Sequence, residues 1–345
     1  MSTVRLSISL RPGHRLAITL AGAAGLTWAM RRRSSLFRLC SASASAARQP
    51  APVSPPTWPS EPVKAALCQL SVGVDKAANI ASARVAIRDA AAQGAQLVVL
   101  PECWNGPYDT ARFAELAEDL RGFTGAALSC APSASALAQA AKDAQVVLVG
   151  GSLPERDGDK LFNTCLVFDA QGQLLAKHRK VHLFDVDIPG GISFRESDTL
   201  SPGDDATVVD TSVGRLGIGI CFDIRFPELS LAMANRGAQV LVFPGAFNTV
   251  TGPLHWELLQ RARAVDCQCF VLTCSPARSP GASYQAWGHS SAIGPFAEIL
   301  ATTDEQPGTV YATLDFQHIQ DRRRAIPLAS QRRGDIYSLL DRKKL

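Results

Sequence analysis

The first 60 residues of this 345-residue chain contain no acidic residue and no lysine, although they hold eight arginines. Subtracting these eight from the 35 basic residues of the chain leaves 27 to set against 31 acidic ones. The net charge of +4 therefore belongs to the N-terminal segment, and the remainder is mildly acidic. The overall basicity is thus no sign of a nucleic-acid-binding surface, and we expect no nucleic-acid partner.

The same N-terminal segment lacks an apolar run of the ~20 residues that span a bilayer. Its apolar stretch, residues 16–30, has 15 residues and is flanked by arginines. A composition of arginine, serine and alanine without acids is typical of an organelle transit peptide. We predict that residues 1–60 are a transit peptide and a proline-rich linker, and that the protein enters a mitochondrion or plastid. A leader without function would leave it cytoplasmic, and no membrane contact is expected of the mature form.

The patterns of three metal or cofactor sites are incomplete. The phosphate-binding GxxxxGK[ST] does not occur. His255-Trp256-Glu257 matches the HxE of zinc deaminases, but the PCxxC that supplies the other ligands is missing. The nine cysteines are odd in number and form no CxxC pair, which favours reduced thiols over a disulfide framework. We predict no cofactor and no metal.

What the chain does contain, from residue 63 onward, is a series of short apolar strands that alternate with helical segments. The pattern predicts a mixed-sheet α/β fold, and without an interior linker we expect one domain over residues 63–340. The helices are expected at 77–93, 228–235 and 255–266, and the strands at 64–70, 96–100, 145–150, 161–169, 174–180, 206–211, 215–221, 239–243, 269–274, 290–300 and 310–315. The last two are expected to close one sheet.

Cys221 stands at the predicted end of an apolar strand, shortly before a helix that begins near Pro227. Backbone N–H groups at such a place favour the thiolate, which is the form of cysteine that attacks. Taken alone, each of nine cysteines is more often a buried structural residue. The surrounding motifs therefore have to decide between the two interpretations.

Two further motifs place chemistry at strand ends. Glu102 directly follows the apolar strand 96–100, where α/β sheets build their sites. Lys180 ends the strand 174–180, and period-2 alternation puts it on the face of His178, Ala176 and Leu174. The opposite face carries Lys177 and Arg179. Taken singly, Glu102 suits an ordinary polar strand end, and a basic run suits a solvated edge.

Together these motifs resemble the nitrilase (carbon–nitrogen hydrolase) superfamily over residues 63–340. Its three signatures occur in order, at Leu100-Pro101-Glu102, at residues 179–182 and at residues 219–228. Within the superfamily the chain is similar to the ω-amidase branch. The segments that carry this closer likeness are residues 182–189, 244–248, 251–261, 275–278, 286–289 and 331–337.

The resemblance implies a nucleophile, Cys221, a general base, Glu102, and a third catalytic member, Lys180, with Glu196 in support. It implies that Lys180 and the N–H of Phe222 stabilise the oxyanion of an amide that is hydrolysed through a thioester. It also implies a four-layer α-β-β-α sandwich with mixed sheets, and a homodimer. Because a glutamate beside a lysine normally stays ionised, proton transfer by Glu102 requires burial to raise its pKa.

The small-molecule substrate implied is an α-keto dicarboxylate monoamide such as α-ketoglutaramate or α-ketosuccinamate. Its free carboxylate needs a donor, for which Tyr108 and Arg225 are the candidates nearest in sequence to the motifs. Arg225 equally suits an ion pair with Asp223 or Glu228. His255, His289 and Trp256 are expected to support the fold.

Two other functions compete with this one. A nitrilase, a carbamoyl-amine hydrolase or an amidase of deaminated glutathione would share the three catalytic residues and differ in the pocket. A catalytically silent subunit would keep the fold, but it has no physical need for Glu102, Lys180 and Cys221 together.

Overall fold

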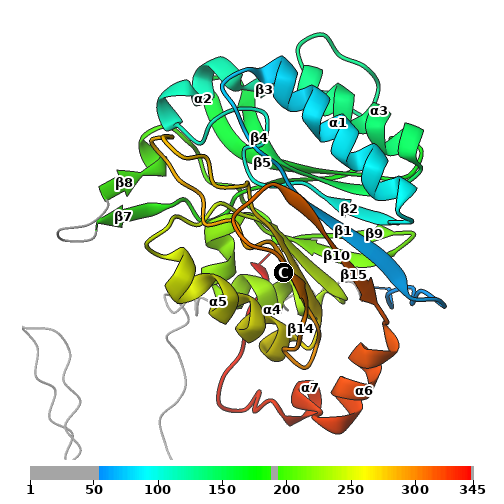
Figure 1. Cartoon of the computed structure of the whole chain (residues 1–345). Coiled ribbons are helices and arrows are strands. Elements are labelled where there is room, and N and C mark those ends of the chain that lie inside the picture. Colours follow the sequence, from blue (N-terminus) through cyan, green and yellow to red (C-terminus); the bar gives the residue numbers. More distant parts are fainter. Residues whose placement is uncertain (1–53, 188–192, 343–345) are drawn as a thin grey trace, which may run out of the picture. The chain divides into compact units, whose positions relative to one another are not determined.

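The computed structural model describes residues 54–187 and 193–342, which include all the predicted site residues. Most of the predicted leader, residues 1–53, lies outside the described part. The described residues form four layers, in which two β-sheets face each other and helices cover both outer faces (Figure 1). The predicted α-β-β-α sandwich with mixed sheets is confirmed.

The first sheet has seven strands in the order β15-β1-β2-β4-β5-β6, with β3 beside β4. Its central strands β1, β2 and β4 are parallel, and antiparallel strands flank them. The bounds are β1 Val63–Gln69, β2 Leu97–Val99, β3 Glu118–Asp119, β4 Val147–Asp157, β5 Lys160–Phe168, β6 Leu174–Arg179 and β15 Gly308–Leu314.

The second sheet has six strands in the order β14-β13-β12-β11-β10-β9, again with a parallel centre, β10, β11 and β12. Its bounds are β9 Thr207–Thr211, β10 Gly214–Ile218, β11 Val240–Pro244, β12 Phe270–Cys274, β13 Ser291–Ile293 and β14 Ile299–Thr302. A separate pair consists of β7 Asp185–Asp187 and β8 Ser193–Arg195. Because both sheets have parallel centres, each gathers several strand ends at one edge, where sites are built.

Seven α-helices complete the described part, and the two outer layers contain four of them (Figure 1). α1 and α3 pack on the first sheet, and α4 and α5 on the second. The bounds are α1 Lys76–Ala92, α2 Thr110–Leu116, α3 Pro132–Ala144, α4 Pro227–Asn235, α5 Gly252–Cys267, α6 Gln317–Ala325 and α7 Leu328–Gln331.

Strand alternation explains how the first sheet faces two cores. Ala65 and Leu67 of β1 lie in the core between the sheets, whereas Ala66 and Cys68 point to the core under α1 and α3. α1 begins at an Asp75 cap that accepts from the N–H groups of its first turn, as capping aspartates do. The strand and helix pattern predicted from the sequence is therefore largely confirmed.

Several expectations need correction. The single strand expected at 290–300 is divided into β13 and β14, and α2, α6 and α7 were not predicted. Residues 308–314 do not close the sheet of β13 and β14, because β15 pairs over seven residues with the edge of β1 in the other sheet. α3 was not predicted, although its buried residues Ala134, Leu137, Ala138 and Ala141 recur at helical spacing and Pro132 stands at its start. Leu174 lies in the outer core, because the β5–β6 register shifts beside it, while Ala176 contacts the inner core.

Candidate active site

Glu102, Lys180 and Cys221 are brought together from three strand ends in two different sheets. Glu102 follows β2, Lys180 directly follows β6, and Cys221 follows β10. The first two side chains are fully buried, and Cys221 is 5% exposed. The edge of the sandwich therefore assembles a carboxylate, an ammonium group and a thiol away from bulk water.

Lys180 lies between two buried carboxylates. Its Nζ is 3.1 Å from Oε1 of Glu102 and 2.9 Å from Oε2 of Glu196. Glu196 opens a short 3₁₀ turn after β8, and its Oε2 also accepts the N–H of Phe184 at 2.7 Å. A buried lysine that donates to two carboxylates is held in position, because moving it away would leave buried charges unpaired.

Glu102 has both of its oxygens occupied. Oε1 accepts from the side-chain amide of Asn163 at 2.9 Å and from Lys180, and Oε2 accepts the N–H of Ala246 at 2.7 Å. The Cys221 thiol is a further hydrogen-bond partner of this carboxylate. The carboxylate is thus held between the lysine and the thiol, which suits it to carry a proton.

The charges of this cluster shift the pKa values of its members. Burial raises the pKa of Glu102 above its usual range, and Glu196 adds to this while Lys180 opposes it. Burial alone would lower the pKa of Lys180, but the negative charges of Glu102 and Glu196 raise it well above normal. Lys180 therefore stays an ammonium ion, and Glu102 is a stronger base than a solvated carboxylate.

The resting form of Cys221 is the thiol. Burial raises its pKa well above that of a free cysteine, and the charge of Glu102 raises it further despite Lys180. The expectation that nearby N–H groups favour a thiolate is therefore wrong for the resting site. The thiol has to lose its proton to a neighbouring base, and Glu102 is the base in contact with it.

The backbone at Cys221 also differs from the expectation. β10 ends at Ile218, three residues earlier than predicted, and Cys221 opens a short 3₁₀ turn, Cys221–Arg225, with φ of +46°. A left-handed cysteine is strained, and the surroundings have to hold it. Gly245 makes part of this possible, since a Cβ there would lie 3.1 Å from the Cα of Cys221.

Asp223 is the group that holds this turn. Its buried carboxylate accepts the N–H of Ile220 at 2.9 Å, on one side of Cys221, and the N–H of His182 at 2.9 Å. The rings of His178 and His182 contact it at 3.3 and 2.8 Å. One carboxylate therefore ties the nucleophile's turn to the segment that follows Lys180, and these hydrogen bonds lower its pKa against burial.

A small cavity opens beside the thiol. Its lining is Phe184, Cys221, Phe222, Arg225, Ala246, Phe247, Thr251 and Tyr284. Its volume is about 10 Å³, close to the space that a single water molecule needs. The cavity is therefore narrow, and it brings the predicted residues Phe222 and Arg225 next to the thiol.

Tyr108 is hydrogen-bonded to another member of the cluster. Its hydroxyl donates to Oε1 of Glu196 at 2.9 Å, and its ring lies 4.6 Å from that of Tyr284. A phenol has one proton to donate, so this hydroxyl is engaged in holding Glu196.

Arg225 forms no ion pair with Asp223, Glu228 or any other acid among residues 54–187 and 193–342. Its guanidinium lies over the rings of Phe247 and Phe222, at 4.6 and 5.5 Å from their centroids. Its Nη1 is 3.2 Å from Nδ1 of His255, and its buried Nε has no partner. Burial lowers the pKa of Arg225, yet an arginine remains charged in proteins.

Several residues of the site were not predicted. Asn163, Ala246 and Tyr284 contact the cluster from β5, from the loop after β11 and from the loop after β12. Asn163 also accepts the N–H of Lys180 through its carbonyl. A polar residue within the apolar run of β5 was the one signal available for Asn163. Nothing local marks a backbone N–H such as that of Ala246.

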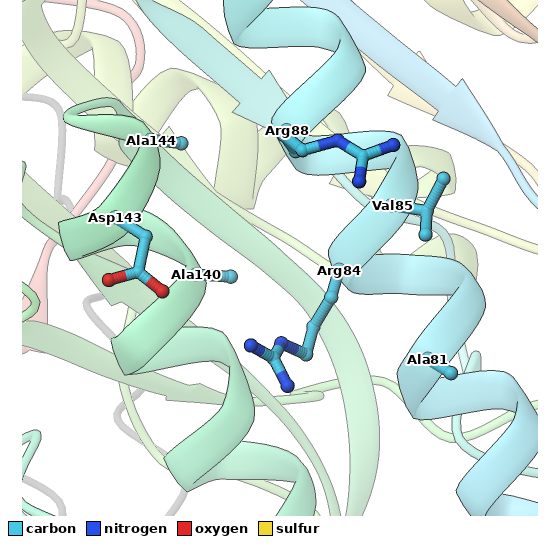
Figure 2. A pocket seen from close by; sticks show the side chains of 7 residues that line it. All are labelled: Ala81, Arg84, Val85, Arg88, Ala140, Asp143 and Ala144. Carbon is cyan, nitrogen blue, oxygen red and sulfur yellow. The ribbon is translucent and has the colours of Figure 1, made fainter.

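A second depression lies elsewhere, between α1 and α3 on the outer layer (Figure 2). Arg84, Arg88, Asp143 and small side chains line it, and none of the clustered residues reaches it. No three His, Cys, Asp or Glu side chains of the described residues are grouped to hold a metal ion. No helix of the described part is long and apolar enough to cross a membrane.

Known proteins resemble this chain in sequence and in fold. A family profile described as carbon-nitrogen hydrolase matches residues 64–324. The chloroplastic omega-amidase of Arabidopsis thaliana is 52% identical over 299 residues, which cover 87% of this chain and 80% of that protein. Nit3 of Saccharomyces cerevisiae, described as a member of branch 10 of the nitrilase superfamily, is 44% identical with a TM-score of 0.72, over 79% of this chain and 97% of its own.

A more distant solved structure bears on the thiol. An amidase from Nesterenkonia sp. AN1 is 25% identical with a TM-score of 0.62, over 78% of this chain and 99% of its own. A mutant of that amidase is described with acrylamide added at its active-site cysteine.

Proposed function

The chain belongs to the carbon–nitrogen hydrolase family of the nitrilase superfamily, and from this we propose that it is an ω-amidase. It hydrolyses the terminal amide of α-keto dicarboxylate monoamides, such as α-ketoglutaramate and α-ketosuccinamate, to the keto acid and ammonia. The observation that carries this proposal is the buried Glu102–Lys180 pair beside Cys221, together with a cavity at Cys221 that also holds an arginine without an acidic partner. The similarity to a curated omega-amidase supports the substrate class.

In the first half of the reaction, the Cys221 sulfur attacks the amide carbon and its proton passes to Glu102. The C–S bond forms as the carbonyl electron pair moves to oxygen, where Lys180 and the N–H of Phe222 stabilise the negative charge. The tetrahedral intermediate then breaks its C–N bond. Glu102 returns the proton to the departing nitrogen, so ammonia leaves and a thioester remains.

In the second half, Glu102 removes a proton from water, and the resulting hydroxide attacks the thioester carbon. The C–S bond breaks, the sulfur takes the proton back from Glu102, and the carboxylic acid is released. The raised pKa of Glu102 suits both halves, because a base whose pKa lies nearer the working pH accepts and donates the proton with less cost. Glu196 and Tyr108 act by holding Lys180 in position.

Arg225 is the proposed partner of the substrate's free carboxylate. It lines the cavity with Cys221, and a half-buried cation without an acidic partner favours an anionic ligand. Tyr108 is engaged by Glu196, which leaves Arg225 as the candidate of the two.

A panel of substrates tests this function against the other members of the superfamily. Purified protein should release ammonia from α-ketoglutaramate with a kcat/KM far above that for a nitrile, a carbamoyl amine or deaminated glutathione. A preference for any of the other three would replace the ω-amidase assignment. Absence of turnover on all four, together with no selective labelling of Cys221 by a thiol reagent, would revive the silent subunit.

The partner and the targeting of the protein belong to the same proposal. A homodimer is supported by the outer face of α5, where Leu254 and Leu258, one turn apart, are 64% and 63% exposed. Sedimentation of wild type and of the double variant Leu254→Lys, Leu258→Lys tests this, and the same sedimenting mass for both proteins would exclude this face as the dimer interface.

Residues 63–340 form the hydrolase domain, and residues 1–60 direct import into a mitochondrion or plastid, for which the chloroplastic relative gives support. A fluorescent fusion of the leader that stays in the cytosol would contradict import.

A further inference from the structure

Arg225 is held by a neutral hydrogen-bond acceptor. Its Nη1 lies 3.2 Å from Nδ1 of His255, which belongs to the first turns of α5. A guanidinium has donors only, so the histidine nitrogen must be the acceptor. The imidazole therefore carries its proton on Nε2 and has no net charge.

The remaining surroundings of Arg225 also leave its charge uncompensated. The rings of Phe222 and Phe247 lie at its sides, and no described residue accepts a hydrogen bond from its Nε or Nη2. Asp223, the nearest acid in sequence, is engaged by His178, His182 and backbone N–H groups. The Nε–Nη2 edge is thus a pair of parallel donors, which is the arrangement that binds a carboxylate through two hydrogen bonds.

We propose that His255 is a specificity-determining positioning residue, which orients Arg225 for an anionic substrate because it accepts a hydrogen bond without adding negative charge. The inference rests on the proposed function of Arg225. A carboxylate at position 255 would accept the same hydrogen bond, but it would neutralise the guanidinium and remove the attraction for the substrate's carboxylate. A neutral acceptor satisfies Nη1 and leaves the positive charge to the ligand.

Helix stability does not explain this histidine. His255 lies close to the N-terminus of α5, where an acidic side chain is favoured by the helix dipole. The position would therefore accept an aspartate as far as the helix is concerned. The electrostatic need of Arg225 is the constraint that distinguishes a neutral acceptor from an acidic one.

The matched variants His255→Asn and His255→Asp test the inference, since both place an acceptor near the position of Nδ1 and differ in charge. The readout is the ratio of kcat/KM for α-ketoglutaramate to kcat/KM for pentanamide, an amide of similar length without the carboxylate. In His255→Asp this ratio should fall at least tenfold, roughly the effect of losing a hydrogen bond to a charged group. His255→Asn should keep the ratio within about threefold of wild type, because its amide oxygen is a neutral acceptor.

Equal ratios in the Asn and Asp variants would overturn the role of His255. The variant Arg225→Met separates this failure from failure of the proposed function: if it lowers the ratio while His255→Asp does not, Arg225 binds the carboxylate and His255 is irrelevant to it. If Arg225→Met leaves the ratio unchanged, the carboxylate is bound elsewhere.

Thermal unfolding of all variants shows that the ratios come from folded protein, and His255→Gln serves as a third variant if His255→Asp does not fold. Its acceptor lies farther from the backbone than Nδ1, so an orienting role predicts a ratio below that of His255→Asn, and equality of these two would count against the proposal.

Discussion

The Oε2 atom of Glu102 and the backbone N–H of Ala246 are 2.7 Å apart, although one residue follows a strand of the first sheet and the other a strand of the second. Ala246 also lines the cavity beside Cys221, and its carbonyl accepts the hydroxyl of Tyr284. The general base proposed here is thus fixed by the packing of the two sheets. This relationship makes the site sensitive to changes that leave each sheet intact.

Replacement of the thiol is expected to abolish turnover. In Cys221→Ala no other group can form the thioester, and the fold should persist because the side chain is small and lies at the cavity. Ammonia release from α-ketoglutaramate and thermal unfolding measure the two effects. Cys267→Ala, in a buried packing position of α5, serves as the control and should keep activity. Activity of Cys221→Ala within about tenfold of wild type, a barrier change of only ~1.4 kcal/mol, would remove Cys221 from the role.

The activity should fall on the acid side as Glu102 becomes protonated. Glu102 has to be ionised to take the thiol proton, and its pKa is raised in the folded protein. The acid limb of kcat/KM is therefore expected above the pKa of about 4.3 of a solvated glutamate. A pH profile under conditions where circular dichroism shows no unfolding tests this. An acid limb at or below that value would mean that another group limits the rate, and Glu102→Gln should be inactive across the range.

Asp223→Asn should lower kcat much more than it changes KM. The two donors bind different oxygens, so the variant places its N–H₂ group against the N–H of either Ile220 or His182, and the turn of Cys221 and the segment after Lys180 lose their common anchor. A displacement of reacting groups by about 1 Å costs about 10²-fold in rate. Steady-state kinetics and the rate of Cys221 alkylation report on this geometry. The exposed Asp335, paired with Arg333, provides the control variant Asp335→Asn, and equal effects of the two would exclude a positioning role.

Arg225→Met should cost roughly 1.5–3 kcal/mol of transition-state binding for α-ketoglutaramate, the usual worth of a hydrogen bond to a charged group. The effect arises because the substrate's carboxylate leaves water and then lacks a counter-charge. The kcat/KM for pentanamide should change little in comparison, since it has no carboxylate to lose. A similar loss on both substrates would mean that Arg225 maintains the structure of the cavity.

Two truncations define the start of the domain. Removal of residues 1–53 should leave a soluble and active enzyme of full stability. Removal of residues 1–60 should keep activity but lower the stability by about 1–2 kcal/mol, part of the value of a fully buried large side chain. The reason is that half-buried Trp58 packs against the hydrophobic cluster that contains the second sheet, and the carbonyl of Ser54 accepts from Arg215 at 3.0 Å. Denaturant unfolding compares the free energies of unfolding of the two truncated proteins. The substitution Trp58→Ala in the protein that lacks only residues 1–53 should reproduce the loss. Equal free energies of unfolding for the two truncations would show that residues 54–60 contribute nothing to stability.

The sequence determined those features that depend on neighbours along the chain. Short apolar runs located the strands that precede Glu102 and Cys221 and the strand that ends at Lys180, because the composition of such a run is a local property of the chain. Alternation with a period of two then assigned the faces of the strand before Lys180. It also put Lys177 and Arg179 on one face, where both contact Glu155. The ordered motifs identified the family, since the residue types that amide hydrolysis requires are written in the chain.

The tertiary structure alone decided which groups meet across long stretches of chain. β15 joined the first sheet because the edge of β1 offered it seven residue pairs, a choice that no local pattern encodes. The pKa of Cys221 rises because burial and a carboxylate 119 positions away outweigh the nearby N–H groups. Tyr108 binds Glu196, and Arg225 finds His255, for the same reason: the free energy of a buried polar group depends on its three-dimensional surroundings, and these exist only after the sheets have packed.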